Sequence, residues 1–425
     1  MVTSTRPVAI VGGVRIPFCR SGSSYAMLSN QQMLTTAMRG LVEKYDLQGQ
    51  EIGEVYAGAV INQPKDWNLA REVVLSTELA PTTPGLTMQQ ACGTSLQAAM
   101  VAAAKIATGQ IDSAIASGSD TVSDVPILFG KKISKRLAGL GKARSFGAKL
   151  KVFKGFSPGE LTPVPPSVNE PRTLMSMGQH CELMAQEWGI TREAQDQLAL
   201  ESHLKASAAY DSGFFDELIV PCEGVVRDNN MRPDSTLDAL AGLRQAYEKS
   251  DKGTLTAGNS TPLTDGASTV LLASEEWARE RGLPILGYLT HSATAAVDFV
   301  GGEGLLMGPT VAVSNMLKQA DLTLQEFDFY EIHEAFAAQV LCTLKAWEST
   351  DYCVNRLGRD AALGSIDRSK MNVKGSSLAV GHPFAATGAR IVGTLAKILE
   401  EAGGGRGLIS VCTAGGMGVS AILEK

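Results

Sequence analysis

The sequence predicts an α/β fold of two similar layered halves, with a mainly helical insertion between them. Three observations favour this fold: the length, a strand–turn–helix–strand order that recurs in both halves, and a segment of different composition between the two copies. With 425 residues the chain exceeds one small core and fits two or three compact units. Its 44% apolar residues, 19% charged residues and 44 glycines are typical of an α/β enzyme with many tight turns.

The first half opens with an apolar, β-rich strand over residues 7–11, which two glycines then interrupt. A further strand is expected near residue 86. It leads through a turn at Cys92 into a helix of small residues over 96–108, and the chain returns as a strand over 111–117. These elements form one βαβ unit.

The second half repeats this order, with a strand over 376–380, a turn at His382, a helix over 386–401 and a strand over 408–412. Both copies place a reactive side chain at the turn before the helix, where α/β folds usually carry their chemistry. We interpret the repetition as an internal duplication that gives α-β-α-β-α layers.

The segment between the copies has a different texture. Two amphipathic helices are expected over 177–188 and 192–212, the second with Thr191 as its N-cap. Residues 258–273 are typical of a turn and strand that return to the first core. The predicted domains are a first half over 1–120 and 257–284, an insertion over 121–256, and a second half over 285–425.

Charge and cysteine content exclude several classes of protein. The net charge of −6 provides no global attraction to nucleic acid or to anionic membranes. No apolar run reaches the length of a membrane span and the start lacks a secretory signal, so a cytoplasmic protein is expected. Seven scattered cysteines without a Cys-x-x-Cys pair indicate reduced thiols.

Cys92, in Gln90-Ala91-Cys92-Gly93-Thr94-Ser95, is a candidate nucleophile. It precedes a predicted helix, whose positive dipole end is expected to lower the pKa of the thiol and favour the thiolate. A cysteine in such a turn is more often structural, so its role depends on the other motifs.

Three further motifs supply candidate partners. His382, in Gly381-His382-Pro383-Phe384, is an imidazole suited to take a proton from a thiol, although a buried structural histidine is the alternative. Cys412 precedes Ala414 and a pair of glycines, whose backbone N–H groups are candidates to hold an oxyanion. His333 ends an apolar strand and is either a second active imidazole or a helix cap. A nucleophilic cysteine, an imidazole and a second thiol suit a carbon–carbon bond reaction beside a thioester.

Joined together, these motifs resemble those of the thiolase superfamily. The resemblance covers nearly the whole chain and rests on four motifs in the family's order. They are Cys92-Gly93-Thr94, His333-Glu334-Ala335-Phe336, Gly381-His382-Pro383-Phe384-Ala385-Ala386-Thr387-Gly388, and Cys412-Thr413-Ala414-Gly415-Gly416-Met417-Gly418. The histidine at 333 and the inserted segment are similar to the thiolase subunit of trifunctional β-oxidation complexes.

The resemblance implies a role for each site residue. Cys92 carries the acyl group, His382 activates it, and Cys412 moves a proton to or from the α-carbon of acetyl-CoA. His333 and His382 hold the thioester oxygen, while the backbone N–H groups of Cys92 and Ala414 hold a second oxyanion. No metal or redox cofactor is implied, because coenzyme A enters as a substrate.

Contacts to CoA are also implied by the resemblance. Met177 corresponds to a methionine beside the pantetheine arm, Thr261 to a pantetheine-contacting serine, and Arg232 to an arginine near the adenine nucleotide. A solvated surface residue is the alternative for Arg232. The chain departs from the family at Ala385 and Ala414, where Gly is usual or frequent; the added methyl groups narrow the site and leave the acyl-chain preference open.

The predicted function is 3-ketoacyl-CoA cleavage by a 3-ketoacyl-CoA thiolase in fatty-acid β-oxidation. The alternatives are an acetoacetyl-CoA thiolase (acetyl-CoA C-acetyltransferase) and a non-catalytic acyl-CoA-binding scaffold. A ketosynthase fits less well, because such enzymes commonly pair their cysteine with two histidines and lack a second cysteine like Cys412.

Partners are expected from the resemblance and from one basic segment. The family is usually a homodimer or homotetramer, and a hydratase/dehydrogenase subunit is a candidate partner. Residues 131–154 contain nine Lys or Arg and no acidic residue. This run is a solvated face, a funnel for CoA phosphates, or a docking surface for a partner subunit or a peripheral membrane contact; we favour docking.

Overall fold

The computed structural model describes residues 5–164 and 166–425, so the first four residues of the predicted first half lie outside the description. The chain divides into two compact units. The main unit comprises the chain up to Asp124 together with Asn169–Lys425, and the second unit is Val125–Val168. Every predicted catalytic residue belongs to the main unit.

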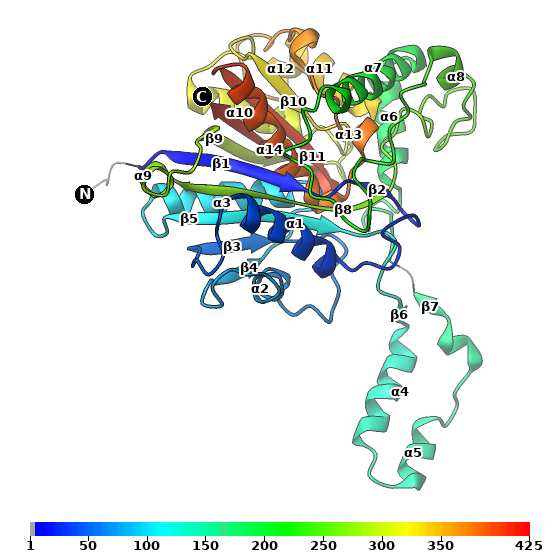
Figure 1. The fold of residues 1–425 in the computed structure, drawn as a ribbon. Helices are drawn as coiled ribbons and strands as arrows, with labels where there is room; N and C mark the ends of the chain where they lie inside the picture. The colour runs from blue at the N-terminus through cyan, green and yellow to red at the C-terminus, as the bar shows by residue number, and fades with distance from the viewer. Residues whose placement is uncertain (1–4, 165) are drawn as a thin grey trace. The chain divides into compact units, whose positions relative to one another are not determined.

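A ten-stranded sheet forms the centre of the main unit (Figure 1). Its strand order is β10-β11-β12-β9-β1-β8-β5-β3-β4, and β2 pairs with β8 beside this path. The strands are β1 (Val8–Arg15), β2 (Cys19–Arg20), β3 (Glu54–Ala57), β4 (Gly85–Thr87), β5 (Ser113–Asp120), β8 (Thr264–Ser274), β9 (Gly287–Ala296), β10 (Phe329–Ile332), β11 (Arg406–Thr413) and β12 (Met417–Glu424).

The sheet contains the same four-strand pattern twice, which confirms the duplication. In β3-β5-β8-β1 the first pair is parallel and the next two pairs are antiparallel. The order β10-β11-β12-β9 shows the same sequence of pairings. The two copies join where Ala9 and Ile10 of β1 pair with Tyr288 and Gly287 of β9.

One predicted strand is wrong. Residues 376–380 contain the short helix α13 (Ser377–Val380). In the first half, β4 pairs with β3 at the edge of the sheet. At the corresponding place beside β10, the described residues form only a single bridge, between Tyr330 and Met371. Gly375 and Gly381 flank this turn with φ values of 71° and 101°. These left-handed residues turn the chain before a strand can extend.

The helices lie in three layers around the two halves of the sheet. Cores between the layers contain Leu41 of α1 on one side, Leu96 of α3 and Leu395 of α14 in the middle, and Val340 of α11 on the other side. The larger layer helices are α1 (Asn30–Lys44), α2 (Leu69–Leu75), α3 (Thr94–Ala107), α10 (Gly308–Ala320), α11 (Ala337–Glu348) and α14 (Thr387–Glu401). Figure 1 shows α1 across the strands of the first half.

Both predicted helices after residue 176 are present. They are α6 (Met177–Glu187) and α7 (Arg192–Asp211), and the Thr191 side chain caps α7 by accepting from the N–H of Ala194. Leu198 of α7 packs in one cluster with Trp347 of α11, so this helix belongs to the main unit. The separate unit is therefore smaller than the insertion predicted over 121–256. Shorter helical elements are α8 (Leu237–Ala241), α9 (Glu275–Glu280), α12 (Thr350–Asn355), η2 (Arg368–Lys370), η3 (Phe384–Ala386) and η4 (Ala414–Gly416).

The second unit consists of α4 (Lys131–Lys142), α5 (Phe146–Val152), η1 (Pro158–Leu161) and the paired strands β6 (Leu128–Phe129) and β7 (Pro163–Val164). Arg136 ties these elements together through an ion pair with Glu160 and hydrogen bonds to the carbonyls of Val152 and Lys154. The other eight basic side chains of 131–154 are exposed.

Across the described part of the chain, no helix combines the length and apolarity needed to cross a membrane.

Candidate active site

Two crossing helices bring the turns of Cys92 and His382 together. The N–H of Ala389 in α14 donates to Ser95 Oγ in α3 at 2.8 Å. A Cβ built on Gly388 would lie 2.2 Å from the backbone N of Leu96, so only glycine permits this approach. The N-termini of α3 and α14 therefore touch, and each helix is preceded by one of the two reactive residues.

Local backbone geometry directs Cys92 toward the end of β11. Ala91 has a left-handed φ of 45°, a strained conformation for a residue with a side chain. A Cβ on Gly93 would lie 2.6 Å from the side chain of Val419 and 3.0 Å from that of Thr413. This close packing places the cysteine beside the β11–β12 turn, where the backbone N–H of Ala414 donates to the Cys92 sulfur.

Cys412 lies near the end of β11 and is 1% exposed. Burial and, to a smaller extent, the charge of a Cys92 thiolate both raise the pKa of Cys412. The two glycines after Ala414 provide fewer free backbone N–H groups for an oxyanion than the sequence predicts. The N–H of Gly415 donates to Glu170 Oε1 at 2.8 Å, which leaves the N–H of Ala414 as the group directed at Cys92.

His333 and His382 face each other with ring centroids 4.2 Å apart. His333 follows β10, and its Nδ1 lies 2.9 Å from Ser377 Oγ. His382 Nδ1 lies 2.5 Å from Thr387 Oγ1. Both Nε2 atoms are buried and have no hydrogen-bond partner among the described residues. The site thus holds two anchored imidazoles whose outer nitrogens are free for a ligand.

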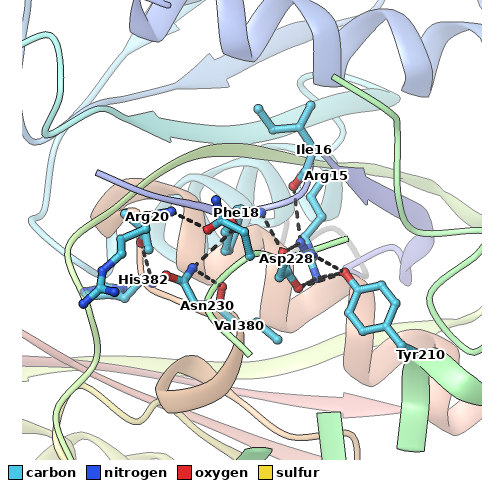
Figure 2. A network of polar contacts seen from close by, with 11 residues as sticks. Arg15, Ile16, Phe18, Arg20, Tyr210, Asp228, Asn230, Val380 and His382 are labelled. Atoms are coloured by element: carbon cyan, nitrogen blue, oxygen red, sulfur yellow. Dashed lines mark hydrogen bonds and ion pairs between the residues drawn. The ribbon is translucent and has the colours of Figure 1, made fainter. Parts of the chain in front are cut away.

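A buried polar network fixes the segment that carries His382 (Figure 2). Arg15 and Asp228 form an ion pair of 2.6 Å, and the Asp228 carboxylate also accepts from Tyr210 Oη. Two residues further on, Asn230 Nδ2 donates to the carbonyl of Val380 at 3.2 Å. The network therefore links β1 to the turn that precedes His382.

Burial keeps the reactive groups neutral in the free protein. It raises the pKa of Cys92 to about 12, although the Ala414 N–H opposes this shift, and it lowers the pKa of His382 to about 3. The pKa of His333 falls well below its usual value and that of Cys412 rises well above, for the same reason. The expected stabilisation of a Cys92 thiolate by the helix dipole is thus wrong for the free protein, because desolvation outweighs it.

Comparisons with known proteins identify the family. The thiolase N-terminal domain matches residues 8–276 and the thiolase C-terminal domain matches residues 283–425. The chain belongs to the thiolase family. It is 42% identical to the 3-ketoacyl-CoA thiolases of Shewanella baltica (strain OS185) and Shewanella loihica over 423 residues, which cover 98% of this chain and 96% of each relative.

Solved thiolase structures share the fold. The acetyl-CoA acetyltransferase of Bacillus anthracis matches with a TM-score of 0.83 and 30% identity, covering 99% of both chains. The human mitochondrial 3-ketoacyl-CoA thiolase in complex with CoA matches with a TM-score of 0.81 and 25% identity, covering 99% of this chain and 98% of that one. The thiolase-like α/β fold predicted from the sequence is confirmed.

The structure places the predicted CoA-contacting residues at different depths within the main unit. Met177 is half-buried and packs on the cluster that contains Cys412. The Thr261 hydroxyl donates to the carbonyl of Ser377 at 2.7 Å, within reach of the α13 turn. Arg232 is exposed, and its backbone N–H donates to His203 Nδ1 at 3.2 Å. Their roles toward CoA stay predictions.

Several residues that contact the predicted catalytic residues were missed by the sequence reasoning. Ser377 contacts Nδ1 of His333, and Thr387 contacts Nδ1 of His382. Thr264 accepts a hydrogen bond from the backbone N–H of His382, and Glu170 accepts one from the backbone N–H of Gly415. Thr387 belongs to the motif around His382, so its spacing was a usable signal. Nothing in the sequence marks the other three, because their partners lie far away along the chain.

Proposed function

We propose that this thiolase is a 3-ketoacyl-CoA thiolase of fatty-acid β-oxidation, which cleaves a 3-ketoacyl-CoA with CoA into acetyl-CoA and a shortened acyl-CoA. One observation carries the proposal: the contact of α3 with α14 brings the turns of Cys92 and His382 together, with the His333 ring 4.2 Å from that of His382 and the strand of Cys412 beside Cys92, in a chain that is 42% identical to 3-ketoacyl-CoA thiolases. Each of the four groups has a distinct task in this reaction.

The first half-reaction transfers the acyl group to Cys92. The sulfur attacks the 3-keto carbon while His382 Nε2 takes the thiol proton. The bond between C2 and C3 then breaks, and its electrons form the enolate of acetyl-CoA. Donors from His333 and His382 stabilise the enolate oxygen, and Cys412 gives its proton to C2, so acetyl-CoA leaves and a Cys92 thioester remains.

The second half-reaction returns the enzyme to its starting state. A CoA thiol gives its proton to the Cys412 thiolate and attacks the acyl carbon on Cys92. The N–H groups of Cys92 and Ala414 hold the oxyanion of this tetrahedral intermediate. The C–S bond to Cys92 then breaks, and His382 returns the proton to that sulfur. Only protons and an acyl group move, so neither a metal nor a redox cofactor is needed and CoA acts as a substrate.

The finer assignments are proposals as well. We propose a cytoplasmic homodimer or homotetramer that binds CoA and acyl-CoA through Met177, Arg232, Thr261 and Ala414, and that works with a hydratase/dehydrogenase subunit. Support for CoA binding is the solved complex of human mitochondrial 3-ketoacyl-CoA thiolase with CoA.

We also propose a peripheral membrane contact through residues 131–154. Eight exposed basic side chains lie on this segment beside exposed Phe146 and Leu150, a combination suited to an anionic lipid surface. Co-sedimentation with anionic phospholipid vesicles is expected, and it should weaken as salt rises. Equal binding to neutral vesicles would contradict a charge-driven contact.

Cleavage of 3-ketoacyl-CoAs with four to sixteen carbons by the purified chain and by Cys92→Ser tests the function. Turnover that extends to long chains and is absent in the variant supports the 3-ketoacyl-CoA thiolase. Activity confined to acetoacetyl-CoA supports the acetyl-CoA C-acetyltransferase, a reading that the Bacillus anthracis relative favours. Tight acyl-CoA binding without turnover would indicate a scaffold.

A further inference from the structure

We infer that Ser377 and Arg390 are positioning residues that hold His333 in the tautomer with its proton on Nε2, from where it is donated to the thioester oxygen. The inference deepens the proposed function and rests on the oxyanion role proposed for His333. It assigns a task to a buried guanidinium that the proposed reaction steps do not otherwise use.

Arg390 of α14 is a buried donor aimed at the start of α13. Its guanidinium donates to Ser377 Oγ at 2.8 Å and reaches Ser376 Oγ at a longer 3.4 Å. Arg390 is 5% exposed, and the carboxyl group nearest to it in an ion pair is that of Glu331 in β10, 1% exposed, with 3.9 Å between the nearest atoms. Because an arginine side chain carries donors only, Ser377 Oγ must act as the acceptor in this contact.

The same oxygen lies 2.9 Å from His333 Nδ1. Arg390 cannot accept a hydrogen bond, so His333 Nδ1 is the one acceptor for the Ser377 hydroxyl proton among the contacts of the described residues. The hydroxyl therefore donates to Nδ1. A neutral imidazole that accepts at Nδ1 carries its proton on Nε2, which here is buried and unpartnered within the described chain.

His382 provides the contrast. Its Nδ1 is anchored to Thr387 Oγ1, and no guanidinium donates to that hydroxyl among the described contacts. Thr387 is thus free to accept from Nδ1, which leaves the Nε2 lone pair for the Cys92 proton. Two rings whose centroids lie 4.2 Å apart enter the reaction in opposite roles, one as donor and one as acceptor. The two roles differ because Arg390 donates to Ser377, the hydroxyl that contacts His333, whereas no guanidinium among the described residues donates to Thr387.

Histidine ¹⁵N NMR of the free protein tests the tautomer directly. The chain has five histidines, and His333→Asn identifies the signals of His333. We expect a protonated Nε2 and an unprotonated Nδ1 in the unmodified chain, and loss of this preference in Ser377→Ala. Ser376→Ala is the matched control, because it removes a neighbouring hydroxyl that contacts Arg390 but forms no hydrogen bond with His333 among the described residues, and it should leave the tautomer unchanged. A proton on Nδ1 in the unmodified chain, or an unchanged tautomer in Ser377→Ala, would overturn the inference.

Kinetics separate positioning from simple structural damage. Ser377→Ala should lower kcat by about 10- to 100-fold with little change in KM, because the lost donor acts in the transition state. In a His333→Asn background the same substitution should cost almost nothing further, since the amide N–H needs no tautomer. Equal losses of kcat in both backgrounds would overturn the positioning role of Ser377. The NMR spectra report the His333 tautomer without any turnover. A wrong tautomer assignment can therefore be distinguished from an absence of the proposed thiolase activity.

Discussion

Single residues in this site derive their chemistry from burial rather than from charge. Desolvation favours a neutral Cys92 thiol and a neutral His382 imidazole, because burial raises the pKa of the first to about 12 and lowers the pKa of the second to about 3. In the proposed reaction the thiol proton therefore moves to His382 as the sulfur attacks the substrate carbonyl.

The neutral pair predicts a flat pH dependence for acylation of Cys92. Protonation of His382 removes the base only as the pH approaches its folded pKa of about 3, and Cys92 ionises only near 12. The single-turnover rate with a 3-ketoacyl-CoA, measured by rapid quench, should therefore vary little between about pH 5 and 8. Circular dichroism at each pH serves as the control for folding. A rate that halves near the ordinary imidazole pKa would contradict the neutral site.

The sequence allowed four catalytic residues to be proposed, but it did not reveal most of the residues that contact them in the structure. Cys92, His333, His382 and Cys412 each lie in a recognisable motif at the end of a strand or the start of a helix. Glu170, by contrast, accepts from Gly415 across a separation of 245 residues. A contact of that kind depends on the finished fold and leaves no local pattern in the sequence.

Among the elements, the crossing of α3 and α14 brings the turns of Cys92 and His382 together. Small residues make the crossing possible: Gly388 lies against the backbone of Leu96, and Ser95 Oγ accepts from the N–H of Ala389. Both helices were predicted closely in extent, because their apolar faces have helical spacing. Helix α13 was mistaken for a strand, since its four residues are too few to show a period.

Gly388→Ala tests the crossing. The new methyl group would meet backbone atoms of Leu96 that cannot move alone, so we expect a loss of about 1–3 kcal/mol in the free energy of unfolding. Activity should fall more than the unfolded fraction explains, because the turn of His382 shifts away from Cys92. Thermal unfolding and steady-state kinetics measure the two effects.

Gly141→Ala in α4 is the matched control. No atom lies within 4 Å of its added Cβ, so a neutral or stabilising change of up to about 1 kcal/mol is expected. Wild-type stability and turnover in Gly388→Ala would show that the helices do not depend on this contact.

At the scale of the whole molecule, all four predicted catalytic residues belong to the main unit and none belongs to the second unit. The extent of this unit was overestimated from the sequence, because an amphipathic pattern does not reveal which core a helix meets. Leu198 of α7 packs beside Trp347 of α11, which makes α7 part of the main unit. The basic composition of 131–154 did mark the part that is separate.

Replacing residues 126–167 with a short Gly-Ser linker tests this division. In the full chain Leu128 pairs with Val164 near the two ends of this segment, so the segment starts and ends at neighbouring points. A short linker can therefore replace it. The hydrophobic clusters of the main unit contain no residue from this segment. We expect a Tm within about 4 °C of the full chain and retained acylation of Cys92. An insoluble or inactive product would show that the main unit needs the second one.

The most direct test of the central claim is the mass of the protein after mixing with 3-ketodecanoyl-CoA in the absence of added CoA. The proposed chemistry predicts release of acetyl-CoA and an octanoyl adduct that peptide mapping locates on Cys92, with no adduct in Cys92→Ser. An adduct on Cys412, or turnover without any covalent intermediate, would contradict the acyl transfer proposed for this site.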